Sequence, residues 1–88
     1  MEKIYKLILA DSVFYDLESI PSRLITEILH KVYLLETFPE LGFAVTDKEK
    51  WIGFRELIAN EYKVLYTVDK QRKIVLVHFI KHGKMNFQ

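Results

Sequence analysis

His78 and His82, near the carboxyl end of the chain, have the spacing of a metal-binding pair. Residues four apart meet on one face of a helix, where two histidines can bind one zinc ion. The surrounding segment is rich in β-branched residues and predicts a strand, on which four residues span about 13 Å. Because this segment also contains no Asp or Glu, the sequence predicts no metal site.

His82 could instead take part in proton transfer. Gly83 follows it and ends the predicted strand, which leaves the imidazole at a sheet edge between Lys81 and Lys84. An imidazole titrates near neutral pH and can act as a general acid or base. A polar strand end without any chemistry is the alternative. We expect His78, inside an apolar run, to be half-buried on the sheet.

Basic side chains are the other concentration of functional groups. They fall in the second half of the chain, at Arg55, Lys63, Arg72, Lys73, Lys81 and Lys84. A basic sheet face beside aromatic residues and a terminal histidine is what RNA binding or cleavage requires. Lysines on a small sheet are also ordinary solvated side chains, so composition alone does not select the RNA interpretation.

Nucleophilic catalysis by serine or cysteine finds no support. Ser12, Ser19 and Ser22 all fall at predicted helix starts, where hydroxyls satisfy backbone N–H groups. None of them stands in a Gly-x-Ser-x-Gly elbow. The chain has no cysteine, which excludes a thiolate nucleophile, a disulfide and a cysteine-based zinc site.

The composition is that of one globular domain over residues 1–88. Half of the residues are hydrophobic and 14% are aromatic, which supplies a single core. A domain this small is marginally stable alone, so a binding partner is expected. The net charge of +1 predicts no affinity for nucleic acid or membranes by itself. The longest apolar run, Ile74 to Ile80, is too short to cross a bilayer, and the start of the chain lacks a signal-peptide pattern.

The first half of the chain predicts a strand and two helices. Residues 3–9 alternate as a strand does, and Asp11 and Ser12 offer N-cap oxygens to a short helix that ends before Pro21. A second helix runs from Pro21 or Ser22 to about Glu36. Its apolar positions recur at threes and fours, at Leu24, Ile25, Ile28, Leu29, Val32 and Leu35. Glu27 and Lys31, four residues apart in the favourable order, mark its polar side and predict a solvated face.

The second half predicts a three-stranded antiparallel meander. Residues 37–50 form a long connection, and the β-rich runs are 51–59, 62–69 and 73–81. The first strand joins this meander through the helical crossover, which gives an α+β domain of order β-α-α-β-β-β with both helices on one sheet face. We expect the core to contain Ile25, Ile28, Val32, Leu35, Val64, Tyr66 and Leu76.

Several segments resemble the RelE/ParE superfamily of bacterial toxins from type II toxin–antitoxin systems. They are Phe38–Gly42 (FPELG), Gly53–Ile58 (GFRELI), Glu61–Val68 (EYKVLYTV), Ile74–His78 (IVLVH) and His82–Lys84 (HGK). Their order and spacing are those of the family, and together they cover nearly the whole chain. The resemblance implies the same β-α-α-β-β-β fold, no cofactor and a cytoplasmic, plasmid-stabilisation type of toxin.

Members that cleave mRNA on the ribosome use cations, a histidine and a glutamate on the sheet. The resemblance assigns charge stabilisation to Lys63, proton transfer to His82, and further RNA or target contacts to Arg55, Lys81 and Lys84. Lys63 stands where the family usually has arginine, so the charge is kept but the planar fork that suits phosphate is lost. Nothing matches the catalytic glutamate or the paired lysines, because Phe54 and Glu56 occupy the nearby positions.

ParE-type members share the Arg-Glu-Leu and His-Gly segments and are thought to poison DNA gyrase through protein contact. The sequence lies closer to that branch, so we expect a growth-inhibiting toxin that a cognate antitoxin neutralises. A RelE-like nuclease acting on the ribosome with mRNA is the alternative, and an inactive peptide-binding module of the same fold is a third. Assembly as a homodimer or as a heterotetramer with the antitoxin is consistent with the resemblance.

Overall fold

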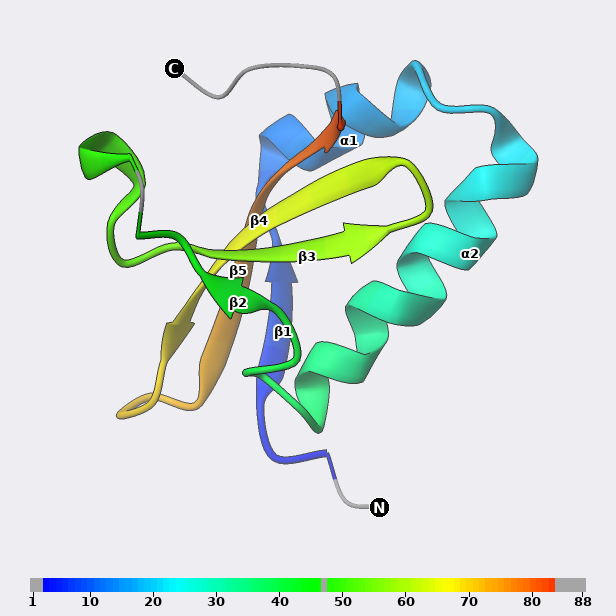
Figure 1. Cartoon of the computed structure of the whole chain (residues 1–88). Helices are drawn as coiled ribbons and strands as arrows, with labels where there is room; N and C mark the ends of the chain where they lie inside the picture. The colour runs from blue at the N-terminus through cyan, green and yellow to red at the C-terminus, as the bar shows by residue number, and fades with distance from the viewer. Residues whose placement is uncertain (1–2, 47, 84–88) are drawn as a thin grey trace.

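The protein forms two helices packed on one mixed sheet, as described by a computed structural model of residues 3–46 and 48–83. In chain order the elements are β1 (Lys6–Leu9), α1 (Asp11–Glu18), α2 (Ser22–Tyr33), a 3₁₀ turn (Leu34–Glu36), β2 (Phe43–Ala44), a second 3₁₀ turn (Glu49–Trp51), β3 (Arg55–Ala59), β4 (Tyr62–Asp69) and β5 (Ile74–His82). Within the described residues the strand order is β1-β5-β4-β3-β2 (Figure 1). Only the β1–β5 pair is parallel among these strands, and the predicted α+β fold is confirmed. No helix in this part of the chain is long and apolar enough to cross a membrane.

The sheet differs from the prediction at its β2 edge. Phe43 and Ala44, inside the expected long connection, pair with Glu56 and Arg55 as a short fifth strand. A strand of two residues is too short to show a period in the sequence. The next strand begins at Arg55 rather than at Trp51, because Trp51 ends a 3₁₀ turn and Gly53 adopts a positive φ of 96°.

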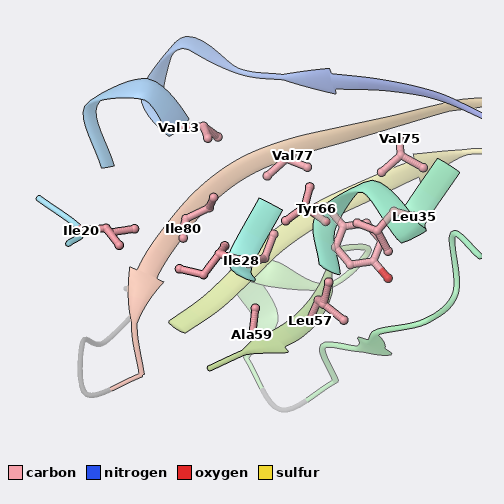
Figure 2. Packing of buried hydrophobic residues seen from close by; sticks show 12 residues of the cluster. Val13, Ile20, Ile28, Leu35, Leu57, Ala59, Tyr66, Val75, Val77 and Ile80 are labelled. Atoms are coloured by element: carbon pink, nitrogen blue, oxygen red, sulfur yellow. The ribbon is translucent and has the colours of Figure 1, made fainter. Parts of the chain in front are cut away.

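Both helices bury their apolar residues against the same face of the sheet. Val13 of α1 and Ile28 of α2 belong to the core cluster that includes the strand residues Val64, Tyr66 and Val77 (Figure 2). Burial is confirmed for Ile28, Val32, Leu35, Val64 and Tyr66. Ile25 is half-buried against this cluster. Leu76 was wrongly predicted in the core, because its neighbours Val75 and Val77 point toward the helices and it lies on the opposite face.

The serines of the first helix bind carbonyl groups rather than backbone amides. Ser12 Oγ donates to the carbonyl oxygen of His78 at 2.5 Å, and Ser19 Oγ donates to that of Asp16 at 2.9 Å. The N-cap positions are Ala10 and Pro21, neither of which makes a side-chain capping bond. The predicted capping role is therefore wrong, and Ser12 instead ties α1 to β5.

The polar face of α2 is attached to the β3–β4 hairpin. Lys31 Nζ donates to the carbonyl oxygen of Ile58 at 2.6 Å, and Glu27 Oε2 accepts from the Asn60 side-chain amide at 2.7 Å. Glu27 and Lys31 are both exposed, in line with the predicted solvated face, and each binds the hairpin rather than the other. These bonds fix the helix to β3.

Candidate functional site

The sheet face opposite the helices carries the candidate site and is called the open face here. Along β3 the alternate residues Leu57 and Ala59 enter the core, so Glu56 and Ile58 lie on the open face. On β4, Lys63 and Leu65 lie on this face, because Val64 and Tyr66 are in the core. The register pairs Glu56 with Leu65 and Ile58 with Lys63, which places all four side chains next to one another.

A pocket of about 290 Å³ lies over this part of the open face. Glu56, Lys63 and Leu65 line it from the sheet, while Phe43 of β2 and Trp51 of the second 3₁₀ turn line it from the sides. The remaining lining residues that flank these are Ala44, Val45, Thr46 and Lys48. The pocket thus combines two aromatic rings, one carboxylate and two ammonium groups, that of Lys63 on the sheet and that of Lys48 beside it.

Glu56 and Lys63 carry opposite charges in the pocket without forming an ion pair. Both side chains are half-buried, and neither has a hydrogen-bond or salt-bridge partner among residues 3–46 and 48–83. They sit diagonally across the β3–β4 ladder. The ammonium can neutralise an anion, and the carboxylate can accept a proton or a hydrogen bond. Sequence reasoning missed Glu56 as a site residue, although its alternation with Leu57 would have placed it on the face of Lys63.

An aromatic cluster supports the Trp51 side of the pocket. The Trp51 ring meets Phe54 edge-on at 5.1 Å and Phe79 at 6.0 Å, and Phe54 lies 4.8 Å from the imidazole of His78. A register shift in β4–β5 pairs Tyr66 with Val77 but Leu65 with Phe79, so His78 is an extra residue. This irregularity brings His78 and Phe79 to the aromatic cluster.

His78 is half-buried, as the sequence predicted. Its Nε2 lies 2.9 Å from the hydroxyl of Thr67. Burial lowers the pKa of His78 from its ordinary value of 6.5, because the charged imidazolium loses its hydration. The neutral ring therefore packs against Phe54 at neutral pH.

His82 and Lys63 lie on opposite faces of the sheet. Lys63 pairs with Lys81, whereas the next pair is Tyr62 with His82, and Tyr62 packs against the core. His82 Nε2 is 3.4 Å from Glu61 Oε2, and its ring lies 5.3 Å from that of Tyr62. The structure therefore brings His82 close to Glu61 and Tyr62 and does not place it in the pocket with Lys63.

Two of the proposed binding cations, Arg55 and Lys81, bind groups of the protein itself. Arg55 Nη2 donates to the carbonyl oxygens of Gly42 at 2.5 Å and Glu40 at 3.2 Å. Lys81 Nζ lies 2.6 Å from Asp16 Oδ1, a carboxylate whose side chain is only 8% exposed. Arg55 and Lys81 thus stabilise the fold. Lys84 lies outside the described residues.

The chain matches one family in sequence and several solved structures in fold. Residues 7–87 match the family described as the ParE toxin of the type II toxin–antitoxin system parDE. No curated protein gave a significant sequence match. The crystal structure of the RelBE2 toxin–antitoxin complex from Mycobacterium tuberculosis is similar with a TM-score of 0.79 at 19% identity, over 89% of this chain and 96% of that one.

Two further structures have the same architecture. The RelE–RelB complex from Pyrococcus horikoshii OT3 matches with a TM-score of 0.68 at 18% identity, over 94% of this chain and 99% of that one. The chromosomal ParDE system from P. aeruginosa matches with a TM-score of 0.70 at 14% identity, over 94% of this chain and 100% of that one. At these identities the structures show that the fold is shared.

Proposed function

Because the chain belongs to the ParE toxin family of type II toxin–antitoxin systems, we propose that it is a growth-inhibiting toxin that poisons DNA gyrase by protein contact. A cognate antitoxin neutralises it. Several solved proteins of the same fold are complexes of a toxin with its antitoxin, which supports this partner. Within the superfamily, the choice of gyrase rests on the geometry of the candidate site.

The observation that carries the gyrase proposal is the separation of Lys63 from His82. An RNase site needs a cation and a proton-transferring group around one phosphate. Strand alternation puts these two residues on opposite faces, and Arg55 and Lys81 are occupied by Gly42 and Asp16. Of the described candidates Arg55, Lys63 and Lys81, Lys63 is then the one left for a phosphate on the open face, where Lys48 also lines its pocket. This arrangement favours a protein target over RNA.

A RelE-like mRNA endonuclease is the second candidate, and one observation favours it. Glu56 and Lys63 line the same pocket and provide a carboxylate and an ammonium group. In such an enzyme Glu56 would take the proton of the ribose 2′-hydroxyl, whose oxygen would bond to the phosphorus, and Lys63 would stabilise the phosphorane charge. The P–O5′ bond would then break, and the 5′-oxygen would take a proton from water or from the protonated Glu56. His82 would have no role in that mechanism.

Induced expression tests the proposal. We expect growth arrest when the toxin is expressed alone and normal growth when the adjacent antitoxin gene is expressed with it. The purified toxin should inhibit supercoiling by purified gyrase, and primer extension on cellular mRNA should show no new cleavage sites. The His82→Gln variant should remain toxic, since the proposed mechanism transfers no proton.

Two outcomes would contradict the proposal. Cleavage of mRNA that is lost in Glu56→Gln or Lys63→Met would make the protein a nuclease. Absence of growth arrest by the wild-type protein would indicate an inactive binding module. Binding of the antitoxin is measured separately, because a partner that binds only the native state raises its melting temperature.

A further inference from the structure

We propose that the pocket lined by Phe43, Trp51, Glu56, Lys63 and Leu65 docks the protein target, and that its occupant is an apolar segment carrying an acidic side chain. This inference rests on the proposed function and assigns that function to one surface. The aromatic rings would hold the apolar part of the segment. Lys63 would pair with its carboxylate, and Glu56 would accept a hydrogen bond from the segment.

The aromatic content of the pocket is typical of a binding centre. Aromatic residues in well-packed pockets carry much of the energy at protein interfaces. The apolar ring of Phe43 is 55% exposed. Ile52, which follows Trp51 in the chain, and Ile58, which pairs with Lys63, are 63% and 40% exposed. Apolar groups around a pocket favour an apolar occupant, since covering them removes hydrocarbon surface from water.

The charges in the pocket favour a protein occupant over a nucleic acid. Half-buried Glu56 and Lys63 have no ionic partners among the described residues. Each charge has therefore lost part of its hydration without gaining an opposite charge. Lys48 also lines the pocket, so a phosphate would meet two ammonium groups but would be repelled by Glu56. A peptide segment suits all three groups, because its carboxylate pairs with Lys63 or Lys48 and its N–H groups donate to Glu56. The internal pairing of Lys81 with Asp16 also removes a second cation from a possible phosphate track.

The position of Phe43 is fixed before any target binds. Phe43 pairs with Glu56 in the sheet, and the preceding residue, Gly42, is held by Arg55 and Tyr66. A backbone segment that is already ordered loses less conformational entropy when it binds. The short strand β2 therefore holds the backbone of Phe43 in place at the edge of the pocket.

A matched pair of phenylalanine variants tests this surface. Phe43 and Phe14 are both 55% exposed, but Phe14 lies on α1 and does not line the pocket. We expect Phe43→Ala to raise the toxin concentration for half-inhibition of purified gyrase at least about tenfold, whereas Phe14→Ala leaves it nearly unchanged. Growth arrest in cells without antitoxin should follow the same order. Melting temperatures of both variants should stay close to that of the wild type, because neither ring is buried.

A second pair tests the charge. Lys63→Met should weaken gyrase inhibition, and Lys6→Met, a change at an exposed strand lysine outside the pocket, should not. Inhibition that is unchanged in both Phe43→Ala and Lys63→Met, with a toxic wild type, would overturn the pocket assignment and leave the proposed function intact. A wild type that cleaves mRNA and loses this activity in Phe43→Ala would show that the pocket binds RNA, which overturns the protein occupant. A wild type without effect on gyrase, mRNA or growth would overturn both proposals.

Discussion

Arg55 and Tyr66 face each other across the β3–β4 ladder and hold the same loop. The Tyr66 hydroxyl donates to the carbonyl oxygen of Pro39 at 2.8 Å and accepts from the backbone N–H of Gly42 at 3.0 Å. Arg55 binds the carbonyl oxygens of Glu40 and Gly42. This pair fixes the chain immediately before β2, and with it one side of the pocket.

Removing the Tyr66 hydroxyl should destabilise the protein. In Tyr66→Phe the ring still fills the core, but the N–H of Gly42 and the carbonyl of Pro39 lose their partner. We expect the free energy of unfolding to fall by about 1–3 kcal/mol in urea denaturation. Tyr15→Phe, at a residue that is 74% exposed, is the control and should change it by less than about 0.5 kcal/mol. Equal stability of the two variants would show that the loop does not depend on this hydroxyl.

Gly42 should tolerate no side chain. A Cβ atom there would lie 2.5 Å from the carbonyl oxygen of Glu56 and 2.8 Å from the Tyr66 hydroxyl. We expect Gly42→Ala to cost at least about 2 kcal/mol by denaturation, because β2 and β3 must separate. Gly53→Ala is the comparison, since a Cβ there meets nothing within 4 Å and only the positive φ of 96° opposes it. That change should cost about 1 kcal/mol, and a similar or smaller cost at Gly42 would contradict the proposed close approach.

The carboxylate of Asp16 should matter more than an exposed ion pair. This carboxylate accepts from the backbone N–H of Ile80 at 2.9 Å and from Lys81 Nζ at 2.6 Å. It therefore binds the end of β5 that lies beyond the residues paired with β1. Asp16→Ala leaves a buried N–H without a partner, so we expect a loss of about 2–4 kcal/mol of unfolding free energy. Glu40→Ala removes the exposed pair with Lys70 and should cost less than about 1 kcal/mol. Comparable losses in the two variants would contradict this ranking.

Stability should fall on acidification partly through His78. Its pKa is lowered in the folded state by burial, so below pH 6.5 the unfolded chain binds more protons than the native protein. The stabilisation that depends on neutral His78 is fully present above the unfolded pKa and is lost as the pH falls through the lowered, folded pKa. We expect the drop in melting temperature between about pH 7.5 and pH 5 to be smaller in His78→Gln than in the wild type. A dependence of melting temperature on pH that is the same in His78→Gln as in the wild type would contradict the prediction.

The sequence by itself determined the elements and the family. The stripe from Leu24 to Leu35 fixes the second helix, because only a helical period places those residues on one face. Alternation from Tyr62 to Val68 places Tyr62, Val64, Tyr66 and Val68 on the core side of β4, as observed. The hairpin between residues 59 and 62 follows from the spacing of the two β-rich runs, and Asn60 in this turn adopts a positive φ of 60°, which asparagine tolerates. These features depend on neighbours in the chain, so local sequence carries them.

Only the tertiary structure decided which charged groups share a surface. Arg55, Lys63 and Lys81 look alike in the sequence, but Arg55 binds the loop at Gly42, Lys81 binds Asp16, and Lys63 lines the pocket. The extra residue at His78 shifts the β5 register, and it sets which strand residues pair with Lys63 and Tyr62. The partners of Arg55 and Lys81 are 13 and 65 residues away in the chain. Such contacts depend on how strands and helices pack, and no local period in the sequence encodes them.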